Sequence, residues 1–511
     1  MIQVLTTAQM RAIEQTAISS DAVDGRTLMF LAGQGVVRAC LARWPRLSQG
    51  PKRAKVLCGP GNNGGDGYVI AVTLLDLGWE VEVSAPWGAE NLPADAAYFH
   101  DLWVTQRVAG PKKAEDWRGY DLIVDAMFGI GLSRPVDLPA VVADAFPPED
   151  ERPHTKRPMV VAVDVPTGLC ADRGIVLGGG AGCWADLTVT FHRLKPGHLL
   201  ADGPDRCGAV EIVDIGISGE VAGLPLQQVA VVPASFAKAQ GHKFDHGHCI
   251  VLAGGAGYGG AARLAARAAL RVGAGLVTLV CPDAAVAENA SRLDAVMVRS
   301  VDGPKALRRM LADRRIGAVV VGPGFGLGQW QVAMIDAALA SRIPCVLDAD
   351  ALTLIGRSPE LRGKLHDACV LTPHGGEFAR LVPELSQPRK GIAGQAAQTP
   401  AAKWSQAHQA AQTLGATVLY KGADTVIATG KEVALHAAAY GRAAPWLATA
   451  GSGDVLAGLI GGLMARGFSG FDAAKHASWL HTEAALSFGP GLMSEDLPDQ
   501  IPAVFRQLRI G

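Results

Sequence analysis

A carboxylate-containing segment near the C-terminus, TAGSGDVLAG (449–458), has the residue types that phosphoryl transfer requires. Its glycines would present successive backbone N–H groups at the start of a helix, and Asp454 would lie in the first turn of that helix. The N–H groups would neutralise phosphate charge while the carboxylate accepts the proton of an attacking hydroxyl. A capped, tightly packed helix is the alternative explanation for the same glycines.

Two further side chains could take part in that chemistry. Lys421 follows an apparent strand in YKGADT and could meet a phosphate, although a single lysine is usually a solvated surface charge. His374 in LTPHGGEF could be a core or capping imidazole as well as a ligand contact.

A second glycine-rich stretch, CGPGNNGGDGYVIA (58–71), lies between an apolar run and an apparent helix. Glycine is retained where φ is positive or where another group approaches the backbone, so a phosphate or nucleotide is a natural occupant. We expect the last glycine, Gly67, to open a helix with apolar positions that include Val69, Ile70, Val72, Leu74 and Leu77. The spacing matches neither the P-loop nor the dinucleotide fingerprint, and a tight strand-to-helix turn remains the alternative.

Two aspartates come directly after apparent strands: Asp125 opens DAMFGIGLSRP and Asp164 opens DVPTGL. Either one alone would often be a helix cap. Open α/β sheets, however, gather ligand groups at the carboxyl edge of their strands, so three polar or glycine-rich loops at that edge indicate a binding site.

The elements that position these residues indicate two α/β domains. Short β-branched runs alternate with helical patterns, which predicts a parallel, doubly wound, Rossmann-like sheet over residues 1–220. This alternation of strand and helix patterns stops near residues 215–240. A second, unrelated alternation of strand and helix patterns defines an α/β domain over residues 235–511. Within it, residues 386–411 should form a surface loop that leads into a helix. The expected strands fall at 54–59, 79–85, 120–126, 158–165, 185–191 and 209–215 in the first domain, and at 248–255, 275–282, 317–326, 344–352, 368–377 and 416–430 in the second.

Composition excludes several classes of partner. The 511 residues are 49% apolar and 19% charged with a net charge of −1, so no overall field attracts nucleic acid or an anionic membrane. No apolar run is long enough to span a bilayer, and residues 1–19 are typical of a capped amphipathic helix rather than a signal peptide. The nine scattered cysteines form no C-x-x-C pair, which favours a reducing cytoplasm over a disulfide framework. We expect a small-molecule ligand and a homo-oligomer.

The motifs of the first domain, together with TFHRLKPGH, resemble the NAD(P)H-hydrate epimerase family over about residues 1–215. The resemblance implies a pocket for the hydrated dinucleotides NADHX and NADPHX, and a potassium ion held by Asn63, Asp125 and the hydroxyl of Thr167, where most relatives have serine. The residues implied to bind the hydrate are Asn62, Asn63, Gly64, Gly65, Asp66, Gly129, Ile130, Gly131, Leu132, Ser133, Arg134, Pro135 and Asp164.

The second domain resembles the ribokinase-like, ADP-dependent NAD(P)H-hydrate dehydratase family over roughly residues 240–505. Six motifs carry this resemblance: GGAGYGGAARLAARAALRVGAGLV, VGPGFG, LDADAL, LTPHGGEF, YKGADTVI and TAGSGDVLAG. The two resemblances together match the bifunctional NAD(P)H-hydrate repair enzymes. They imply that ADP is a co-substrate with Mg²⁺ bridging its phosphates. The hydrate would contact Ala261, Gly324, His374 and Asp454, and the adenine nucleotide would contact Lys421, Gly422, Ala423, Asp424, Thr425 and Gly453.

The catalytic hypotheses concern two aspartates. Asp454 would deprotonate the hydroxyl of the hydrated ring for attack on ADP, which releases AMP and then phosphate. Asp164 would serve both proton transfers of the epimerisation, provided that its pKa is raised. The alternative is a sugar or vitamin kinase fused to a dinucleotide-binding module without catalytic activity; formation of ADP rather than AMP would distinguish that kinase.

Overall fold

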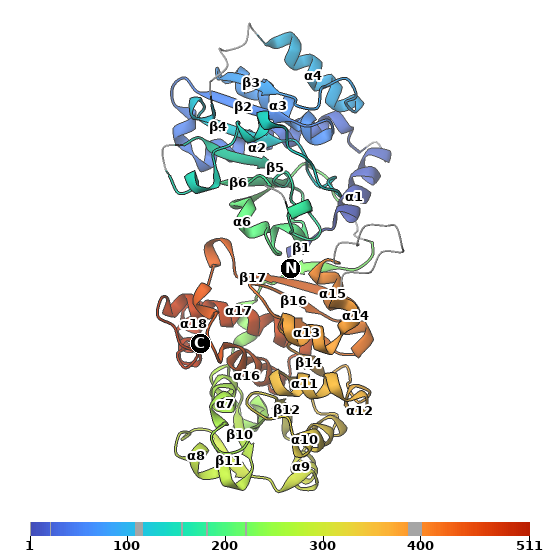
Figure 1. Cartoon of the computed structure of the whole chain (residues 1–511). Coiled ribbons are helices and arrows are strands. Elements are labelled where there is room, and N and C mark those ends of the chain that lie inside the picture. The colour runs from blue at the N-terminus through green and yellow to red at the C-terminus, as the bar shows by residue number, and fades with distance from the viewer. Residues whose placement is uncertain are drawn as a thin grey trace. The chain divides into compact units, whose positions relative to one another are not determined.

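The computed structural model describes residues 2–20, 22–107, 116–154, 157–179, 182–219, 222–386 and 401–510. The chain divides into two compact units, residues 3–225 and residues 226–511 together with residues 1–2 (Figure 1). Most of the predicted surface loop, residues 387–400, lies outside the described residues.

The N-terminal unit contains a six-stranded sheet in the order β3-β2-β4-β5-β6-β7, and every neighbouring pair is parallel. The chain moves from β2 outward to β3 and then returns to the other side of β2 with β4, so the carboxyl ends of β2 and β4 form the switch point at which open α/β sheets bind ligands. The elements up to β7 are β1 (Ile2–Val4), α1 (Thr7–Ser19), α2 (Gly25–Arg43), β2 (Arg53–Cys58), α3 (Asn62–Asp76), β3 (Glu80–Ser84), α4 (Ala94–Gln106), β4 (Leu122–Ala126), α5 (Ala140–Ala143), β5 (Met159–Val163), β6 (Leu187–Phe191), α6 (Gly203–Cys207) and β7 (Ala209–Val213).

Both faces of this sheet are covered, because successive strand residues point to opposite sides. Val124 packs with residues of α1 to α4 on one face. Its neighbour Ile123 packs on the other face, with Trp117, Phe146 and Trp184 from irregular segments. The predicted doubly wound domain is confirmed, although only one of its faces carries long helices.

The strands of the C-terminal unit form one sheet in the order β8-β17-β16-β15-β14-β13-β12-β9-β10-β11. β16 is antiparallel to both β15 and β17, and the other neighbouring pairs from β8 to β11 are parallel. The elements are β8 (Leu226–Gln228), β9 (His248–Leu252), α7 (Gly259–Arg271), β10 (Leu276–Cys281), α8 (Val286–Ala290), β11 (Met297–Ser300), α9 (Gly303–Leu311), β12 (Ile316–Val321), α10 (Gln329–Ala340), β13 (Cys345–Leu347), α11 (Ala349–Arg357), α12 (Pro359–Arg362), β14 (Cys369–Leu371), α13 (Gly375–Leu381), α14 (Pro383–Ser386), α15 (Lys403–Leu414), β15 (Thr417–Tyr420), β16 (Asp424–Ala428), β17 (Val433–Ala437), α16 (Ser452–Ala465), α17 (Gly470–Phe488) and α18 (Leu497–Gln507).

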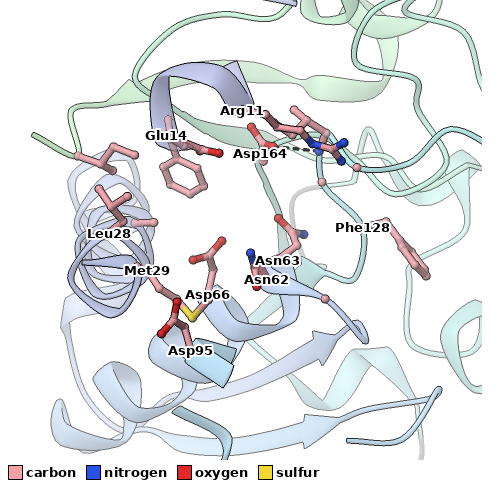
Figure 2. A pocket seen from close by; sticks show the side chains of 18 of the residues that line it. Arg11, Glu14, Leu28, Met29, Asn62, Asn63, Asp66, Asp95, Phe128 and Asp164 are labelled. Atoms are coloured by element: carbon pink, nitrogen blue, oxygen red, sulfur yellow. Dashed lines mark hydrogen bonds between the residues drawn. The ribbon is translucent and has the colours of Figure 1, made fainter. Parts of the chain in front are cut away.

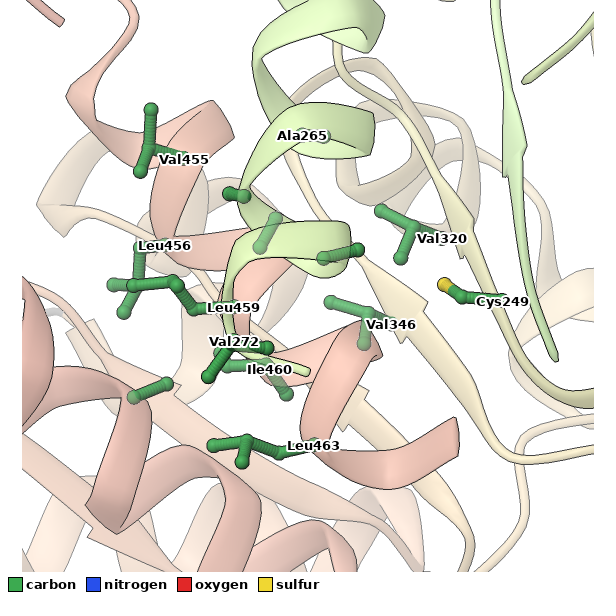
Figure 3. Close-up of a cluster of buried hydrophobic side chains, with 14 of the residues drawn as sticks. Cys249, Ala265, Val272, Val320, Val346, Val455, Leu456, Leu459, Ile460 and Leu463 are labelled. Carbon is green, nitrogen blue, oxygen red and sulfur yellow. The ribbon is translucent and has the colours of Figure 1, made fainter. Parts of the chain in front are cut away.

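Helix α16 is anchored in the core of this unit, which fixes the position of Asp454 at its start. Figure 3 shows Leu459 and Ile460 of α16 among side chains of α7 and of the sheet. The glycines of α16 permit this contact, because a Cβ on Gly458 would lie 2.1 Å from the carbonyl oxygen of Ala265 in α7. The mid-helix glycines therefore serve helix packing.

The structure bears on the state of the cysteines and on the presence of membrane-spanning helices. All nine cysteines are free thiols, and eight of them are buried. Within the described ranges, no helix combines the length and the apolar character needed to cross a bilayer.

Candidate active sites

A cavity of about 480 Å³ opens at the switch point of the N-terminal sheet. Figure 2 shows that Asn63 and Asp66 reach it from α3, Asp164 from the end of β5, and Arg11 and Glu14 from α1. Of the residues implied to bind the hydrate, those lining the cavity are Asn62, Asn63, Asp66, Gly129, Ile130, Gly131, Leu132 and Asp164. The structure thus brings the three predicted loops together.

The remaining residues of that set do not line the cavity. Gly64 and Gly65 are buried inside α3, where a Cβ would lie 2.0 Å from the carbonyl oxygen of Gly59 or 2.4 Å from the sulfur of Met29. Ser133, Arg134 and Pro135 continue the loop beyond the cavity and are exposed.

The prediction that Gly67 opens the helix is wrong, because α3 already begins at Asn62. The starting turn therefore contains Asn62 and Asn63 and points them at the cavity. A Cβ on Gly67 would lie 2.8 Å from Cys58 Sγ of β2 and 2.8 Å from Ala126 Cβ of β4. Close packing of α3 onto the sheet, rather than a ligand, explains this glycine.

Gly129, by contrast, lies at the cavity itself. A Cβ on Gly129 would lie 2.7 Å from the Asn63 side-chain oxygen and 3.0 Å from Asp164 Oδ2. Any larger residue at this position would collide with two of the polar groups that line the site.

Asp164 is held rigidly by its surroundings. Its φ of 67° is in the left-handed region, which a non-glycine residue adopts only when its neighbours enforce it. Lys195 Nζ donates to Oδ1 at 2.8 Å, Thr190 Oγ1 donates to the same oxygen at 2.9 Å, and the Ile130 N–H donates to Oδ2 at 3.0 Å. The carbonyl of Asp164 lies 2.9 Å from Nε2 of His198.

These contacts decide the protonation of the site. Burial acts to raise the pKa of Asp164, but the ion pair and hydrogen bond with Lys195, assisted by the Ile130 N–H, bring the pKa below its usual value. The condition for Asp164 to serve both proton transfers, a raised pKa, is therefore not met. Burial and the Asp164 charge instead raise the pKa values of Glu14 and Asp66, whose carboxyl groups have no hydrogen bond or ion pair within the described chain.

The residues implied to hold potassium include a buried pair. Thr167 Oγ1 donates to Asp125 Oδ1 at 2.7 Å, and the Thr167 N–H donates to Oδ2 at 2.8 Å. Asp125 is 1% exposed and its pKa is raised, chiefly by burial, because no cation of the described chain forms an ion pair with it. The Asn63 side-chain nitrogen is also buried without a partner. Oxygen donors around an uncompensated carboxylate fit a cation.

In the C-terminal unit, α16 begins after Gly451, whose φ is +87°, and Asp454 lies in its first turn as predicted. Burial, followed by the charge of Asp348, raises the pKa of Asp454 to about 7, although Lys421 opposes the shift. Lys421 Nζ donates to Asp348 Oδ1 at 2.7 Å and lies 3.7 Å from Glu377 Oε2. Burial acts to lower the pKa of Lys421, but these two carboxylates raise it overall, so this lysine is a fixed positive charge.

A cavity of about 520 Å³ lies beside this cluster and is lined mainly by apolar groups. Of the residues implied to bind the nucleotide, Lys421, Gly422, Ala423, Thr425 and Gly453 line it. Asp424 does not, because its side chain pairs with Lys403 at 2.5 Å.

Three residues of the C-terminal unit are implied to contact the hydrate in addition to Asp454: Ala261, Gly324 and His374. Gly324, with a φ of +59°, lies against α7, where a Cβ would be 3.3 Å from Ala261 Cβ. His374 caps α13: its Nδ1 accepts from the Gly376 N–H at 3.0 Å, and Glu377 accepts from the His374 N–H at 2.8 Å. The capping alternative thus describes His374 in the structure, and its ring remains largely exposed.

Sequence reasoning missed several residues of both sites. Lys195 lies in the TFHRLKPGH motif, but nothing in the spacing of that motif indicates that its ammonium group is the buried partner of Asp164. Arg11 and Glu14 lie on a helix that was interpreted only as amphipathic. Asp348 directly follows β13 as Asp164 directly follows β5, and that shared position was the signal available for it, whereas Glu377 lies within α13.

Comparison with known proteins agrees with the two-part site. A family model described as NAD(P)H-hydrate dehydratase matches residues 249–501, and one described as YjeF-related protein N-terminus matches residues 25–197. The bifunctional NAD(P)H-hydrate repair enzyme Nnr of Coxiella burnetii is 32% identical over 491 residues, which cover 93% of each chain. The chain belongs to this family.

Other relatives extend the comparison. The enzyme of the same name from Escherichia coli K12 is 32% identical over 92% of this chain and 87% of its own. Among solved structures, the ADP/ATP-dependent NAD(P)H-hydrate dehydratase of Bacillus subtilis, co-crystallised with ATP and Mg²⁺, is 26% identical with a TM-score of 0.41, and the match covers 53% of this chain and 93% of that one.

Proposed function

We propose that this chain repairs hydrated nicotinamide dinucleotides. The N-terminal unit interconverts the R and S forms of NADHX and NADPHX, and the C-terminal unit dehydrates the S form at the expense of ADP, yielding AMP and phosphate. Membership of the repair-enzyme family supports both activities. The observation that carries the proposal is Asp454, a carboxylate with a pKa of about 7 at a helix start beside a fixed lysine and a nucleotide-sized cavity.

In the dehydratase reaction, Asp454 accepts the proton of the hydroxyl at C6 of the hydrated ring. The hydroxyl oxygen attacks the terminal phosphorus of ADP, and AMP leaves. The lone pair of the ring nitrogen then expels phosphate, and loss of a proton from C5 restores the dihydronicotinamide. A base with a pKa near neutrality suits this step, and Lys421 with the first N–H groups of α16 balances the phosphate charge.

In the epimerase reaction, the C–O bond breaks with assistance from the ring nitrogen, and water adds to the other face of the resulting iminium. Asp164, held ionised by Lys195, is suited to accept a proton from that water. The departing hydroxyl needs a proton donor, and an ionised carboxylate cannot supply one. Glu14 and Asp66 are the candidates, because both line the same cavity and their raised pKa values favour the protonated form.

Two cations complete the proposal. Potassium bound by Asn63, Asp125 and Thr167 would compensate the buried carboxylate and keep the adjoining loop in place. Magnesium would be held chiefly by the phosphates of ADP, as is usual for this ion.

The test is to mix the purified protein with ADP, Mg²⁺ and the R form of NADHX, and to follow the return of the absorbance of the reduced nicotinamide. Return with equal formation of AMP supports both activities. Return from the S form alone would remove the epimerase assignment, and formation of a stable phosphorylated product with ATP would indicate a kinase. A cytoplasmic location and a homo-oligomeric state also stay predictions, and size-exclusion chromatography with light scattering tests the latter.

A further inference from the structure

Lys403, the first residue of α15, clamps the turn that joins β15 to β16. Its Nζ donates to the Lys421 carbonyl at 3.2 Å, to the Asp424 carbonyl at 3.0 Å and to Asp424 Oδ1 at 2.5 Å. The same ammonium group lies 4.6 Å from the centroid of the Tyr420 ring, directly before the turn. One cation therefore contacts both ends of a turn of only a few residues.

The turn is closed on its other side as well. Thr425 Oγ1 donates to the Gly422 carbonyl at 2.7 Å and accepts from the Gly422 N–H at 3.2 Å. A Cβ on Gly422 would lie 2.7 Å from Lys403 Nζ and 2.7 Å from Asp424 Oδ1, so only glycine leaves room for the clamp.

This turn forms one wall of the cavity beside Asp454. Lys421, Gly422 and Ala423 line the cavity, whereas Lys403 and Asp424 do not appear among its lining residues. The Lys421 ammonium, which faces Asp348 and Glu377, is carried on the backbone whose carbonyl Lys403 holds. A displacement of the turn would move the nucleotide-facing backbone and the base of the Lys421 side chain together.

We propose that Lys403 and Asp424 form a partly buried ion pair that positions the turn 421–423 for the phosphates of the adenine nucleotide, without either side chain touching the nucleotide. This inference rests on the proposed function. It assigns Asp424 a structural role in place of direct nucleotide contact, and it assigns a role to Lys403 that the motifs did not indicate.

The test measures ADP binding by calorimetric titration with Mg·ADP and the steady-state KM and kcat for dehydration of S-NADHX. We expect Lys403→Met and Asp424→Asn each to raise the Kd and KM for ADP by on the order of tenfold or more, because small displacements of positioning groups have large effects. At saturating ADP, kcat should change much less. Lys403→Arg should restore part of the affinity, and the double variant should bind no more weakly than the weaker single variant.

Arg466→Met is the matched control. Arg466 also donates to backbone carbonyls, those of Val272, Phe236 and Ala237, but it follows the far end of α16 and lines neither of the two cavities described above. It should lower thermal stability without changing the Kd for ADP. Wild-type ADP affinity in Lys403→Met or Asp424→Asn, or losses in the double variant that simply add, would overturn the inference. If the wild-type chain binds ADP but does not dehydrate NADHX, the proposed function fails, while the binding data still decide the role of Lys403.

Discussion

Replacing Asp454 with asparagine should abolish dehydration and also stabilise the C-terminal unit at alkaline pH. The folded environment raises the pKa of this carboxyl group from 3.8 to about 7, through burial and the neighbouring acidic groups. Each pKa unit corresponds to about 1.4 kcal/mol, so ionised Asp454 costs the folded state at most about 4 kcal/mol. Asparagine has nearly the same shape and no charge, and therefore removes that cost.

The pH dependence gives the sign of the effect. A carboxyl group with a raised pKa destabilises the folded state progressively as pH rises from its unfolded pKa, and the penalty is complete once pH exceeds the folded pKa. The gain from Asp454→Asn should be about 0.6 kcal/mol at pH 4, about 1.7 kcal/mol at pH 5 and about 4 kcal/mol at pH 8, taking the two pKa values of 3.8 and about 7.

Scanning calorimetry of the full chain between pH 5 and pH 8 measures this difference. Addition of ADP identifies the transition of the C-terminal unit, since a ligand stabilises the unit that binds it. In parallel, AMP formation by the wild-type chain should increase as pH rises through about 7, and the variant should lose about 10²- to 10⁴-fold in rate. A stability difference that is the same at pH 5 and pH 8 would refute the assignment of a destabilised, basic carboxylate at this position.

Three predictions concern the epimerase cavity, each measured as interconversion of R- and S-NADHX with the uncatalysed rate subtracted. Lys195→Met should abolish epimerisation, because Asp164 loses the cation that pairs with it, while dehydration of S-NADHX should persist. Retained epimerisation would contradict this. Either Glu14→Gln or Asp66→Asn should lower the rate of epimerisation by about 10²- to 10⁴-fold. Gln15→Ala, a change at an exposed residue of the same helix as Glu14, is the control. Full activity in both carboxyl variants would exclude this pair as the source of the proton donor. Gly129→Ala should weaken NADHX binding, since its Cβ would fall 2.7 Å from the Asn63 oxygen, and unchanged affinity would show that the loop can move aside.

Most of the fold could be predicted from hydrophobic patterns. All twelve expected strand regions contain a strand, because buried parallel strands appear as short β-branched runs. The missed strands do not share one cause: β17, VALHA, is almost wholly buried, whereas β8 has only three residues. β11, MVRS, is mostly exposed at the edge of its sheet. The region 416–430 was treated as one segment, but it contains β15 and the antiparallel β16, joined by the turn that Lys403 holds.

The limits of the site prediction have a different physical origin. Glycine-rich spacing identified the correct loops, but it could not separate glycines that admit a ligand from those that admit a neighbouring element. Gly129 lies between two polar groups of the cavity, whereas Gly64 and Gly67 allow α3 to approach the backbone and side chains near β2 and β4. That distinction depends on atoms that are remote in sequence, as does the contact of Lys195 with Asp164.

The two aspartates expected to be catalytic illustrate the same dependence in their ionisation. Both lie in glycine- or proline-containing motifs, and both are withdrawn from solvent, which by itself raises the pKa of a carboxyl group. At Asp164, Lys195 and a backbone N–H outweigh burial and keep the group ionised. At Asp454, Lys421 is already engaged by Asp348 and Glu377, so its charge compensates burial only in part and the pKa remains near 7. The partner of the lysine in each site therefore determines which groups can transfer protons. In the epimerase cavity Lys195 pairs directly with Asp164, so the proposed reaction needs a second group as the acid. In the dehydratase site Lys421 pairs with other carboxylates, so Asp454 alone can both lose and accept a proton near neutral pH.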